Sequence, residues 1–305
     1  MPARASILTP NVRGALWMLL SVAGATGMTV MVRVLSAEMA SPMIAFLRSL
    51  GALLFLAPLL WSAAPPTPGG LKAPWLHVAR GGLVAVAVNL GFFALSALPI
   101  ATATILFFLA PVFSTMLAPL MVGEAVGPRR WAAVGVGFLG AVVVLRPGFG
   151  AFEPAMLSAV ASSVLFATAL LLGKRASAID GSGAVFASTT VISAALTLPP
   201  ALFVWTLPGS ALAWVAVLAL AAASSLRAYA DICAFASGEA SFVAPISYLR
   251  LPSVGLAGWL LFRERLDGWA LAGGAIIVAA TLYIMIRERQ VTRPARPAPP
   301  ADHAP

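Results

Sequence analysis

Long hydrophobic runs without a charged residue follow one another along this chain. Residues 14–32, 49–71, 154–173 and 268–286 each form one such run. A helix needs about 20 apolar residues to cross the hydrocarbon core of a bilayer, which is about 30 Å thick. Each of these four runs therefore predicts one transmembrane helix.

Two other runs are too long for a single helix. Residues 81–123 contain a break at Leu98-Pro99, and residues 181–226 contain one at Pro208-Gly209. Because proline and the residue before it tend to end a helix, each run predicts two helices and a short turn. With two shorter runs, the pattern predicts an all-α membrane protein of ten transmembrane helices. These start near residues 14, 42, 75, 101, 131, 154, 184, 211, 241 and 268.

The two halves of the chain resemble each other. An apolar stretch with an internal proline ends at Glu124 and is followed by Trp131, and the same order returns at Glu264 and Trp269. This spacing predicts a tandem duplication. Five helices in each unit would give the two units opposite topology, an arrangement found in transporters. We therefore expect two inverted five-helix repeats.

The duplication divides the chain into four segments. A short N-terminal segment covers residues 1–12, and the two repeats cover residues 13–147 and 152–288. The remaining residues, 289–305, are rich in proline, alanine and arginine. Such a composition cannot form a packed core, so we expect a disordered cytoplasmic tail.

The composition excludes a water-soluble protein. Hydrophobic residues make up 61% of the chain and charged residues only 10%, whereas soluble proteins have about 25% charged residues. The net charge of +9 comes with no basic patch interleaved with aromatic residues, so nucleic acid is not an expected partner. A single cysteine, Cys233, excludes an internal disulfide and a cysteine pair for a metal.

The positions of the 19 lysines and arginines predict the orientation. In bacterial membrane proteins, basic residues are enriched in cytoplasmic segments. If both termini are cytoplasmic, thirteen basic residues lie inside and four outside, with Arg48 and Arg250 within spans. The inside set is Arg4, Arg13, Lys72, Arg80, Arg129, Arg130, Lys174, Arg175, Arg227, Arg287, Arg289, Arg293 and Arg296; the outside set is Arg33, Arg146, Arg263 and Arg265.

Two segments carry a resemblance to a known family. Residues 97–113, from Ala-Leu-Pro-Ile-Ala-Thr-Ala to Phe-Phe-Leu-Ala-Pro-Val-Phe, resemble the fourth helix of the EamA-type drug/metabolite transporter superfamily. Residues 245–264, from Pro-Ile-Ser-Tyr-Leu-Arg-Leu-Pro to Gly-Trp-Leu-Leu-Phe-Arg-Glu, resemble its ninth helix. The resemblance, taken with the ten spans and the duplication, covers about residues 12–288.

This resemblance implies a multi-pass inner-membrane carrier that moves a small organic metabolite by alternating access. The family's cavity is lined mainly by the third, fourth, eighth and ninth helices, and its fifth and tenth helices imply a homodimer contact. Residues 248–251 are similar to bacterial carriers of S-adenosylmethionine or riboflavin. A metabolite or amino-acid efflux carrier of the same superfamily is an alternative, and a membrane structural protein or channel is an alternative of another class.

Arg250 is the first candidate for a substrate contact. It lies about ten residues into the ninth predicted span, roughly 13 Å deep at the rise of a helix, where an arginine is costly unless it faces water or a partner. Ser247 and Ser253 share its helix face because they lie three residues away, and Tyr248 is close by. The alternative is a structural tie between Arg250 and backbone carbonyls.

Further candidates lie on other predicted spans. Asn89 is the only amide within a span and either bridges helices or meets substrate. Arg227 and Tyr229 lie on the eighth span, and Phe108 could stack on a flat ring. Arg48, near the end of its span, is expected to extend to the outer headgroups. Helix breaks are expected at prolines in corresponding places of the two halves, Pro111, Pro245 and Pro252.

Acidic residues are absent from the middle of every predicted span, and this limits the chemistry. A neutral to positive cavity favours an anionic, zwitterionic or aromatic substrate over a lipophilic cation, since nothing offsets the desolvation of a cation. Proton coupling would fall to Asp231 or Glu239, which bracket the link between the eighth and ninth spans. No histidine, cysteine or motif arrangement typical of an enzyme occurs, so we expect neither catalysis, a metal nor a cofactor.

The predicted topology can be tested with fusions to a reporter enzyme that is active only in the periplasm. We expect no activity when the reporter follows Arg289, and activity when it lies within residues 146–153. Equal activity from both fusions would contradict the ten-span topology.

Overall fold

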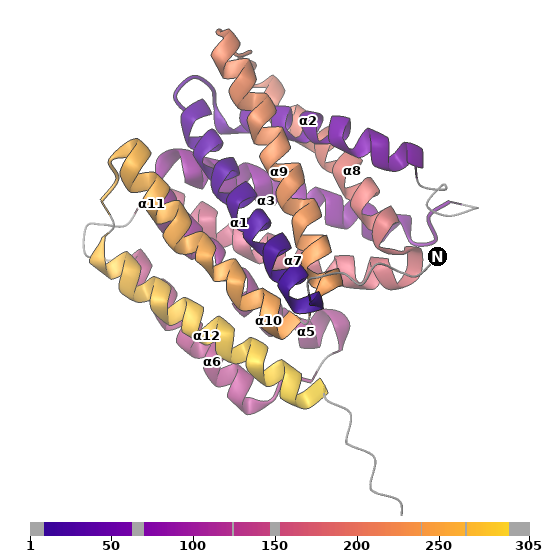
Figure 1. Ribbon diagram of the computed structural model, residues 1–305, viewed down its shortest axis with the longest axis vertical. Helices are drawn as coiled ribbons and strands as arrows, with labels where there is room; N and C mark the ends of the chain where they lie inside the picture. Colours follow the sequence, from indigo (N-terminus) through magenta and orange to yellow (C-terminus); the bar gives the residue numbers. More distant parts are fainter. Residues whose placement is uncertain are drawn as a thin grey trace, which may run out of the picture.

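The computed structural model describes residues 9–62, 70–123, 125–146, 153–238, 240–265 and 267–292, which are helical with connecting turns and contain no strand. Figure 1 shows the helices gathered into one bundle. Glu124, Glu239, most of the predicted N-terminal segment and nearly all of the predicted tail lie outside these residues. The helices are α1 (Pro10–Leu35), α2 (Ser41–Ser62), α3 (Pro74–Ala97), α4 (Ile100–Phe107), α5 (Ala110–Val122), α6 (Pro128–Leu145), α7 (Pro154–Asp180), α8 (Ser182–Leu202), α9 (Ala211–Ser237), α10 (Ala240–Val243), the 3-10 helix η1 (Ala244–Leu249), α11 (Arg250–Phe262) and α12 (Gly268–Thr292).

The predicted all-α membrane class is confirmed. A helix begins at or close before each of the ten predicted starts. In the described part of the chain, eight stretches are long and apolar enough to cross a membrane: α1, α3, α4 with α5, α6, α7, α8, α9 and α12. The other two predicted spans are α2, whose apolar part is described over Ser41–Phe55, and the ninth, which is divided into α10, η1 and α11.

Proline and left-handed residues mark several helix ends. Pro10, Pro74, Pro128 and Pro154 each stand in the first turn of a helix, where no intrahelical N–H bond is lost. At the other end, α5 closes on Gly123 with φ of 70°, and α11 closes on Arg263 with φ of 55°. A left-handed residue at this position is a common helix terminator.

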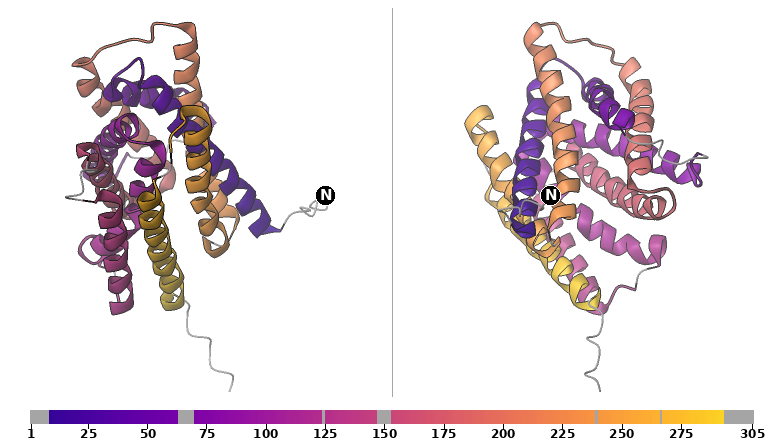
Figure 2. Two further views of the ribbon diagram at one scale, coloured as in Figure 1. Left: turned by 90° about the vertical axis from the view of Figure 1, so that its left-hand side faces the viewer. Right: turned by 45° about the vertical axis from the view of Figure 1, so that its right-hand side comes forward.

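Helices from the two halves of the chain pack against each other. The most extensive contacts are those of α1 with α9, α3 with α7, α6 with α12, α3 with α8 and α2 with α8. In Figures 1 and 2, α1 and α9 run side by side, and α6 and α12 form a pair at the edge of the bundle. The bundle is therefore built from contacts between residues far apart in the sequence.

Glycines permit the closest of these contacts. A Cβ atom at Gly24 in α1 would lie 2.9 Å from the Ala223 carbonyl oxygen of α9. Between α6 and α12, a Cβ atom at Gly140 would lie 2.9 Å from the Gly273 oxygen, and one at Gly273 would lie 2.6 Å from the Gly140 oxygen. Small residues allow backbones to approach in this way in membrane bundles.

Four glycines of α6 and α12 serve packing within one chain. Besides Gly140 and Gly273, Gly137 lies against Val112 and Gly274 against Ile105. Large hydrophobic side chains of both helices, among them Leu139 and Leu271, remain exposed. The homodimer stays a prediction.

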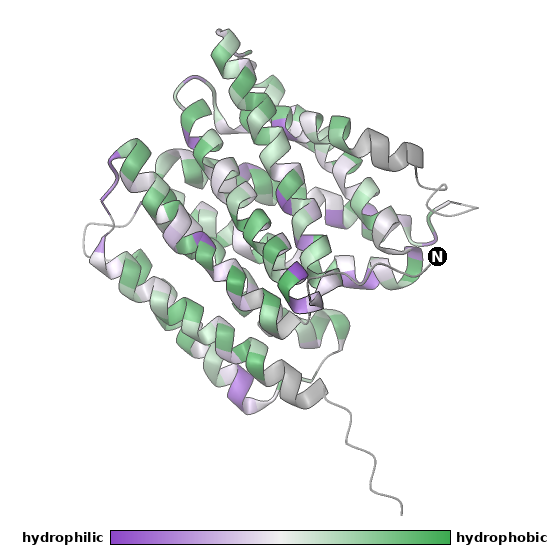
Figure 3. Cartoon of the chain, in the orientation of Figure 1, coloured by the Kyte–Doolittle hydropathy of each residue, from purple (hydrophilic) through white to green (hydrophobic). Residues whose placement is uncertain are grey.

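The outer surface is apolar, as a lipid-facing surface requires. Large hydrophobic side chains are exposed on it, including Leu139 in α6 and Leu212 in α9, and Figure 3 shows hydrophobic residues along the visible helices. Some buried hydroxyl groups bond within their own helices. Thr29 and Thr104 each donate to the carbonyl four residues earlier, which satisfies the hydroxyl where water is absent.

The α6–α12 contact gives a stability prediction. Gly273→Ala should destabilise the protein by about 1–3 kcal/mol, because the added methyl group meets backbone that cannot move aside cheaply. Gly135→Ala is the matched control, since nothing lies within 4 Å of a Cβ atom there. It should be neutral or slightly stabilising. Thermal unfolding in detergent measures both, and equal melting temperatures would contradict this account of the contact.

Candidate functional site

A cavity of about 790 Å³ lies among helices from both halves of the chain. Its wall includes residues of α2, α3, α5, α7, α9 and α11, and it extends to Arg130 and Lys174, where α6 begins and α7 ends. Lys174 is exposed, so the cavity reaches the surface at this end of the bundle. Its volume is that of a site for a drug-sized organic molecule.

A helix break forms part of the cavity wall. Helix α4 ends at Phe107 and α5 begins at Ala110, immediately before Pro111, whose ring nitrogen has no hydrogen to donate to the preceding turn. The carbonyl of Leu106, a buried residue beside the break, accepts hydrogen bonds from the Ser163 hydroxyl at 2.8 Å and the Leu109 amide at 3.1 Å. The break is thus stabilised by α7, while Phe107 and Pro111 line the cavity.

The second half contains a different kind of break. Residues Ala244–Leu249 form η1, which begins with Pro245 in its first turn. Pro252 lies in the first turn of α11 and leaves that helix uninterrupted, because a proline in this position removes no intrahelical bond. The two breaks meet where the Phe108 ring stacks on the Tyr248 ring, with centroids 5.2 Å apart.

The cavity wall is strongly basic. Six of the described residues that line it are basic, and none of the described lining residues is acidic. They are Arg48, Arg80, Arg130, Lys174, Arg227 and Arg250. A bound solute therefore meets a positive potential.

Some of these arginines have partners. The Arg227 Nε atom lies 3.8 Å from an Asp231 carboxylate oxygen, and Asp231 also accepts the Ser21 hydroxyl at 2.5 Å. Arg80 donates to the Thr189 hydroxyl. Asp231 lies within α9, one turn after Arg227 and before the helix ends at Ser237.

Arg48 and Arg250 have no hydrogen bond or ion pair to the described residues. The Nε atom of each is buried without a hydrogen-bond partner, and both interact electrostatically with Arg227. The Arg48 guanidinium lies over the Phe92 ring, 5.7 Å from its centroid. The prediction that Arg48 extends to the headgroups is therefore wrong, since its side chain faces the cavity.

The structure separates the predicted substrate contacts into two groups. Arg250 and Arg227 line the cavity. The other five, Ser247, Asn89, Tyr248, Tyr229 and Phe108, are not among the described lining residues.

Several of these five have other contacts. Asn89 donates to the Ala85 carbonyl of its own helix at 2.9 Å. The Tyr229 ring packs edge-on against Trp17, and the Tyr248 hydroxyl lies 3.7 Å from the Met285 sulfur. Ser247 is half-buried in η1. A substrate contact by these residues stays a prediction.

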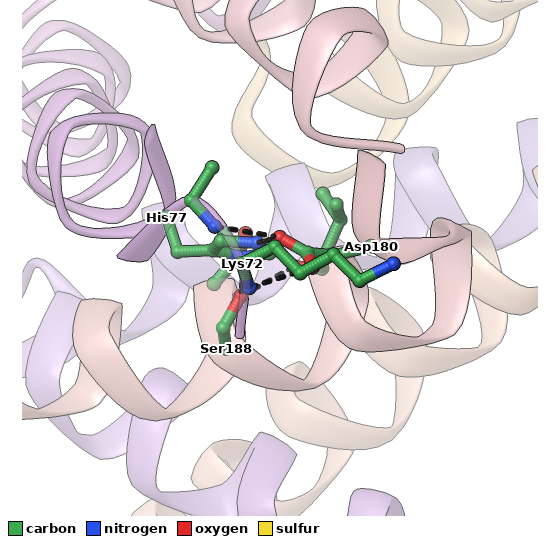
Figure 4. Close-up of polar contacts among 7 residues, drawn as sticks. Lys72, His77, Asp180 and Ser188 are labelled. Carbon is green, nitrogen blue, oxygen red and sulfur yellow. Dashed lines mark hydrogen bonds and ion pairs between the residues drawn. The ribbon is translucent and has the colours of Figure 1, made fainter. Parts of the chain in front are cut away.

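A buried polar cluster around His77 could not be predicted from the sequence. The His77 Nε2 atom lies 3.0 Å from the Asp180 carboxylate, and its Nδ1 atom lies 2.6 Å from the Ser188 hydroxyl. Asp180 also accepts the backbone amide of Lys72 at 2.9 Å. Figure 4 shows how these groups join the start of α3 to the end of α7 and to α8. The residues are more than 100 positions apart in sequence, so only the fold brings them together.

A second network lies at Glu264, between α11 and α12. One carboxylate oxygen accepts the Ile100 amide at 2.8 Å and so caps the N-terminus of α4. The other lies 3.5 Å from Arg33 of α1, which also donates to the Ser96 carbonyl. Burial raises the pKa of Glu264, while the Ile100 amide and the Arg33 guanidinium act in the opposite direction. This network joins α1, α3, α4 and the end of α11.

Comparison with known proteins decides the family. The model of the EamA-like transporter family matches residues 12–146. A riboflavin transporter of Rhizobium johnstonii is 34% identical over 294 residues, which cover 92% of this chain and 94% of that protein. The chain belongs to the EamA-like transporter family.

Other relatives agree with this assignment. An S-adenosylmethionine uptake transporter of Rickettsia felis is 29% identical over 90% of this chain and 92% of its own length, and a pseudopaline exporter of Pseudomonas aeruginosa is 26% identical over 84% and 90%. A crystal structure with a TM-score of 0.61 and 18% identity covers 92% of this chain and 99% of its own; it shows the shared fold. The protein is a multi-pass inner-membrane transporter.

The raised pKa of Glu264 predicts a pH dependence of stability. A group whose pKa is higher in the folded state contributes stability that is present below its ordinary pKa and is lost as the pH rises through its raised pKa. Glu264→Gln keeps an acceptor for the Ile100 amide but cannot titrate. The melting temperature of the natural protein minus that of Glu264→Gln should therefore fall as the pH rises above about 4, the ordinary range of a glutamate pKa. A difference that stays constant or grows as the pH rises would contradict the prediction.

Proposed function

We propose that this protein is a carrier of two inverted five-helix repeats, residues 13–147 and 152–288, which moves a small organic metabolite through the basic cavity by alternating access. The single observation that carries the proposal is a cavity between the two halves with six basic lining residues and no acidic one among those described. Transporters built from such repeats bind their substrates at the interface between the repeats.

The pairing of the helices supports the repeat. If the five spans of one half correspond in order to those of the other, exchanging the halves turns the α1–α9 contact into the α7–α3 contact. The same exchange leaves the α6–α12 and α2–α8 contacts unchanged. The left-handed ends at Gly123 and Arg263 also correspond, as do the breaks before Pro111 and in η1.

The basic residues support an orientation with both termini in the cytoplasm. In this orientation Arg130 and Lys174 lie at the cytoplasmic end, so the cavity as described is open toward the cytoplasm. The Glu264 network then lies at the periplasmic end. Alternating access requires that contacts at the two ends break and form in turn.

The cavity favours some substrates over others. A lipophilic cation would enter a positive site in which no acidic lining residue is described, and its desolvation would not be offset. A riboflavin-like compound offers carbonyl oxygens as acceptors for arginine, together with a flat ring for Phe92, Phe107 and Phe166. An S-adenosylmethionine-like compound carries a sulfonium and an ammonium group, which are less well matched to this wall.

The relative named an S-adenosylmethionine uptake transporter favours import, and the pseudopaline exporter supports a second candidate, metabolite efflux by the same site. A channel or a structural role is less well supported, because neither requires paired helix breaks beside a cavity with buried arginines.

Transport by purified protein in proteoliposomes tests the proposal. We expect saturable uptake from a panel of labelled riboflavin, riboflavin 5′-phosphate and S-adenosylmethionine, and no transport of ethidium with or without a proton gradient. Proton-driven ethidium transport, with none of the three metabolites moved, would contradict the proposed function.

A further inference from the structure

We infer that the substrate of this carrier is an organic anion whose acidic group, a phosphate or a carboxylate, binds to Arg48 and Arg250 together. The inference rests on the proposed function, because it places the anion in the same cavity, and it narrows the substrate from three classes to one. It is based on how the basic side chains of the cavity are paired.

Four of the six basic lining residues have interactions of their own. Arg227 pairs with Asp231, Arg80 donates to Thr189, and Arg130 donates to the Ala125 carbonyl at 2.7 Å. Lys174 also has an interaction within the protein. These side chains shape the potential of the cavity, and each already has a partner within the protein.

Arg48 and Arg250 differ from the other four. Neither has a hydrogen bond or ion pair to the described residues, and each has a buried Nε atom without a partner, as Arg80 also has. Arg227 repels both of them, and Asp231 attracts Arg250 without pairing with it. The face of Phe92 compensates only part of the desolvation of Arg48. Two guanidinium groups that line one cavity without a hydrogen bond or ion pair to the described residues are therefore placed to bind an anion from outside the protein.

The geometry of arginine determines which anions fit. A guanidinium group presents its N–H donors as a planar fork that matches the paired oxygens of a carboxylate or phosphate. Arg48 belongs to α2 and Arg250 to α11, so an anion held by both would connect the two halves of the chain. The aromatic side chains Phe92, Phe107 and Phe166 line the same cavity and offer apolar surface for the rest of the molecule.

A substrate of balanced charge is less well accommodated. The ammonium group of a zwitterion needs a carboxylate or several carbonyl oxygens. The nearby carboxylate, Asp231, already binds Arg227 and the Ser21 hydroxyl, and it is not among the described lining residues. The described wall thus offers sites for an anionic group and a ring, but no charged site for a cationic group.

Three flavins that differ only in their side chain test the inference. Riboflavin is uncharged, riboflavin 5′-phosphate carries a phosphate, and carboxymethylflavin carries a carboxylate. In proteoliposomes, riboflavin 5′-phosphate, carboxymethylflavin or both should be taken up with an apparent affinity at least about tenfold higher than that of riboflavin, a free-energy difference of about 1.4 kcal/mol. The better of the two anionic flavins identifies the acidic group.

Arg48→Gln and Arg250→Gln should each weaken uptake of that anionic flavin by at least about thirtyfold and change riboflavin uptake little. Arg250→Lys should recover part of the loss, because lysine keeps the charge without the fork. Arg129→Gln is the control, since Arg129 is exposed at the start of α6 and does not line the cavity. It should transport as the natural protein does.

Melting temperatures without ligand show whether the variants fold. Removing an unpaired buried charge should leave each glutamine variant as stable as the natural protein or more stable, whereas loss of stability in both variants would mean that the arginines are structural and would overturn the inference. Riboflavin uptake equal to or better than that of both anionic flavins would overturn it too, and would leave the proposed carrier function standing. Uptake of none of the three flavins would overturn it together with the proposed riboflavin-like substrate.

Discussion

The presence of arginine side chains in the interior of a membrane bundle is the constraint on which the rest of this structure depends. An arginine in the hydrocarbon region is stable only if it reaches water, a counter-charge or backbone carbonyls. Arg48 and Arg250 have neither hydrogen bonds nor ion pairs among the described residues. They therefore require contact with water or a solute, and the cavity of about 790 Å³ that they line has room for either.

The packing of the helices holds this cavity open. Close backbone contacts at Gly24, Gly140 and Gly273 fix the helix pairs around it. Helices α4 and α5 are separated beside Pro111, where the Ser163 hydroxyl donates to the Leu106 carbonyl. The end of α11 is attached to α1 and α4 through Glu264. The site is therefore held by contacts between helices from opposite halves of the chain, which is the arrangement expected if the halves move relative to each other.

Much of the fold could be predicted from the sequence, because hydrophobic length and helix breaks are local properties. The ten starts, the turn after Leu98 and the break before Pro111 are of this kind. The direction in which a side chain points from its helix is not a local property. Arg48 was wrongly expected at the headgroups because only its distance from the end of the predicted span was considered. Asn89 lies within α3, as expected, but is not among the described residues that line the cavity. The His77–Asp180 cluster depends on the packing of three helices, which no local pattern encodes.

The most direct test of a hydrated cavity around Arg250 is its accessibility to a water-soluble thiol reagent. The chain has a single cysteine, Cys233, so a Cys233→Ser protein gives a cysteine-free background for Arg250→Cys. Leu139→Cys, at an exposed apolar position in α6, is the lipid-facing control. In inside-out vesicles treated with a charged, membrane-impermeant methanethiosulfonate, the account predicts that Arg250→Cys reacts and Leu139→Cys does not. An Arg250→Cys protein as unreactive as the control would contradict a water-filled cavity at this residue.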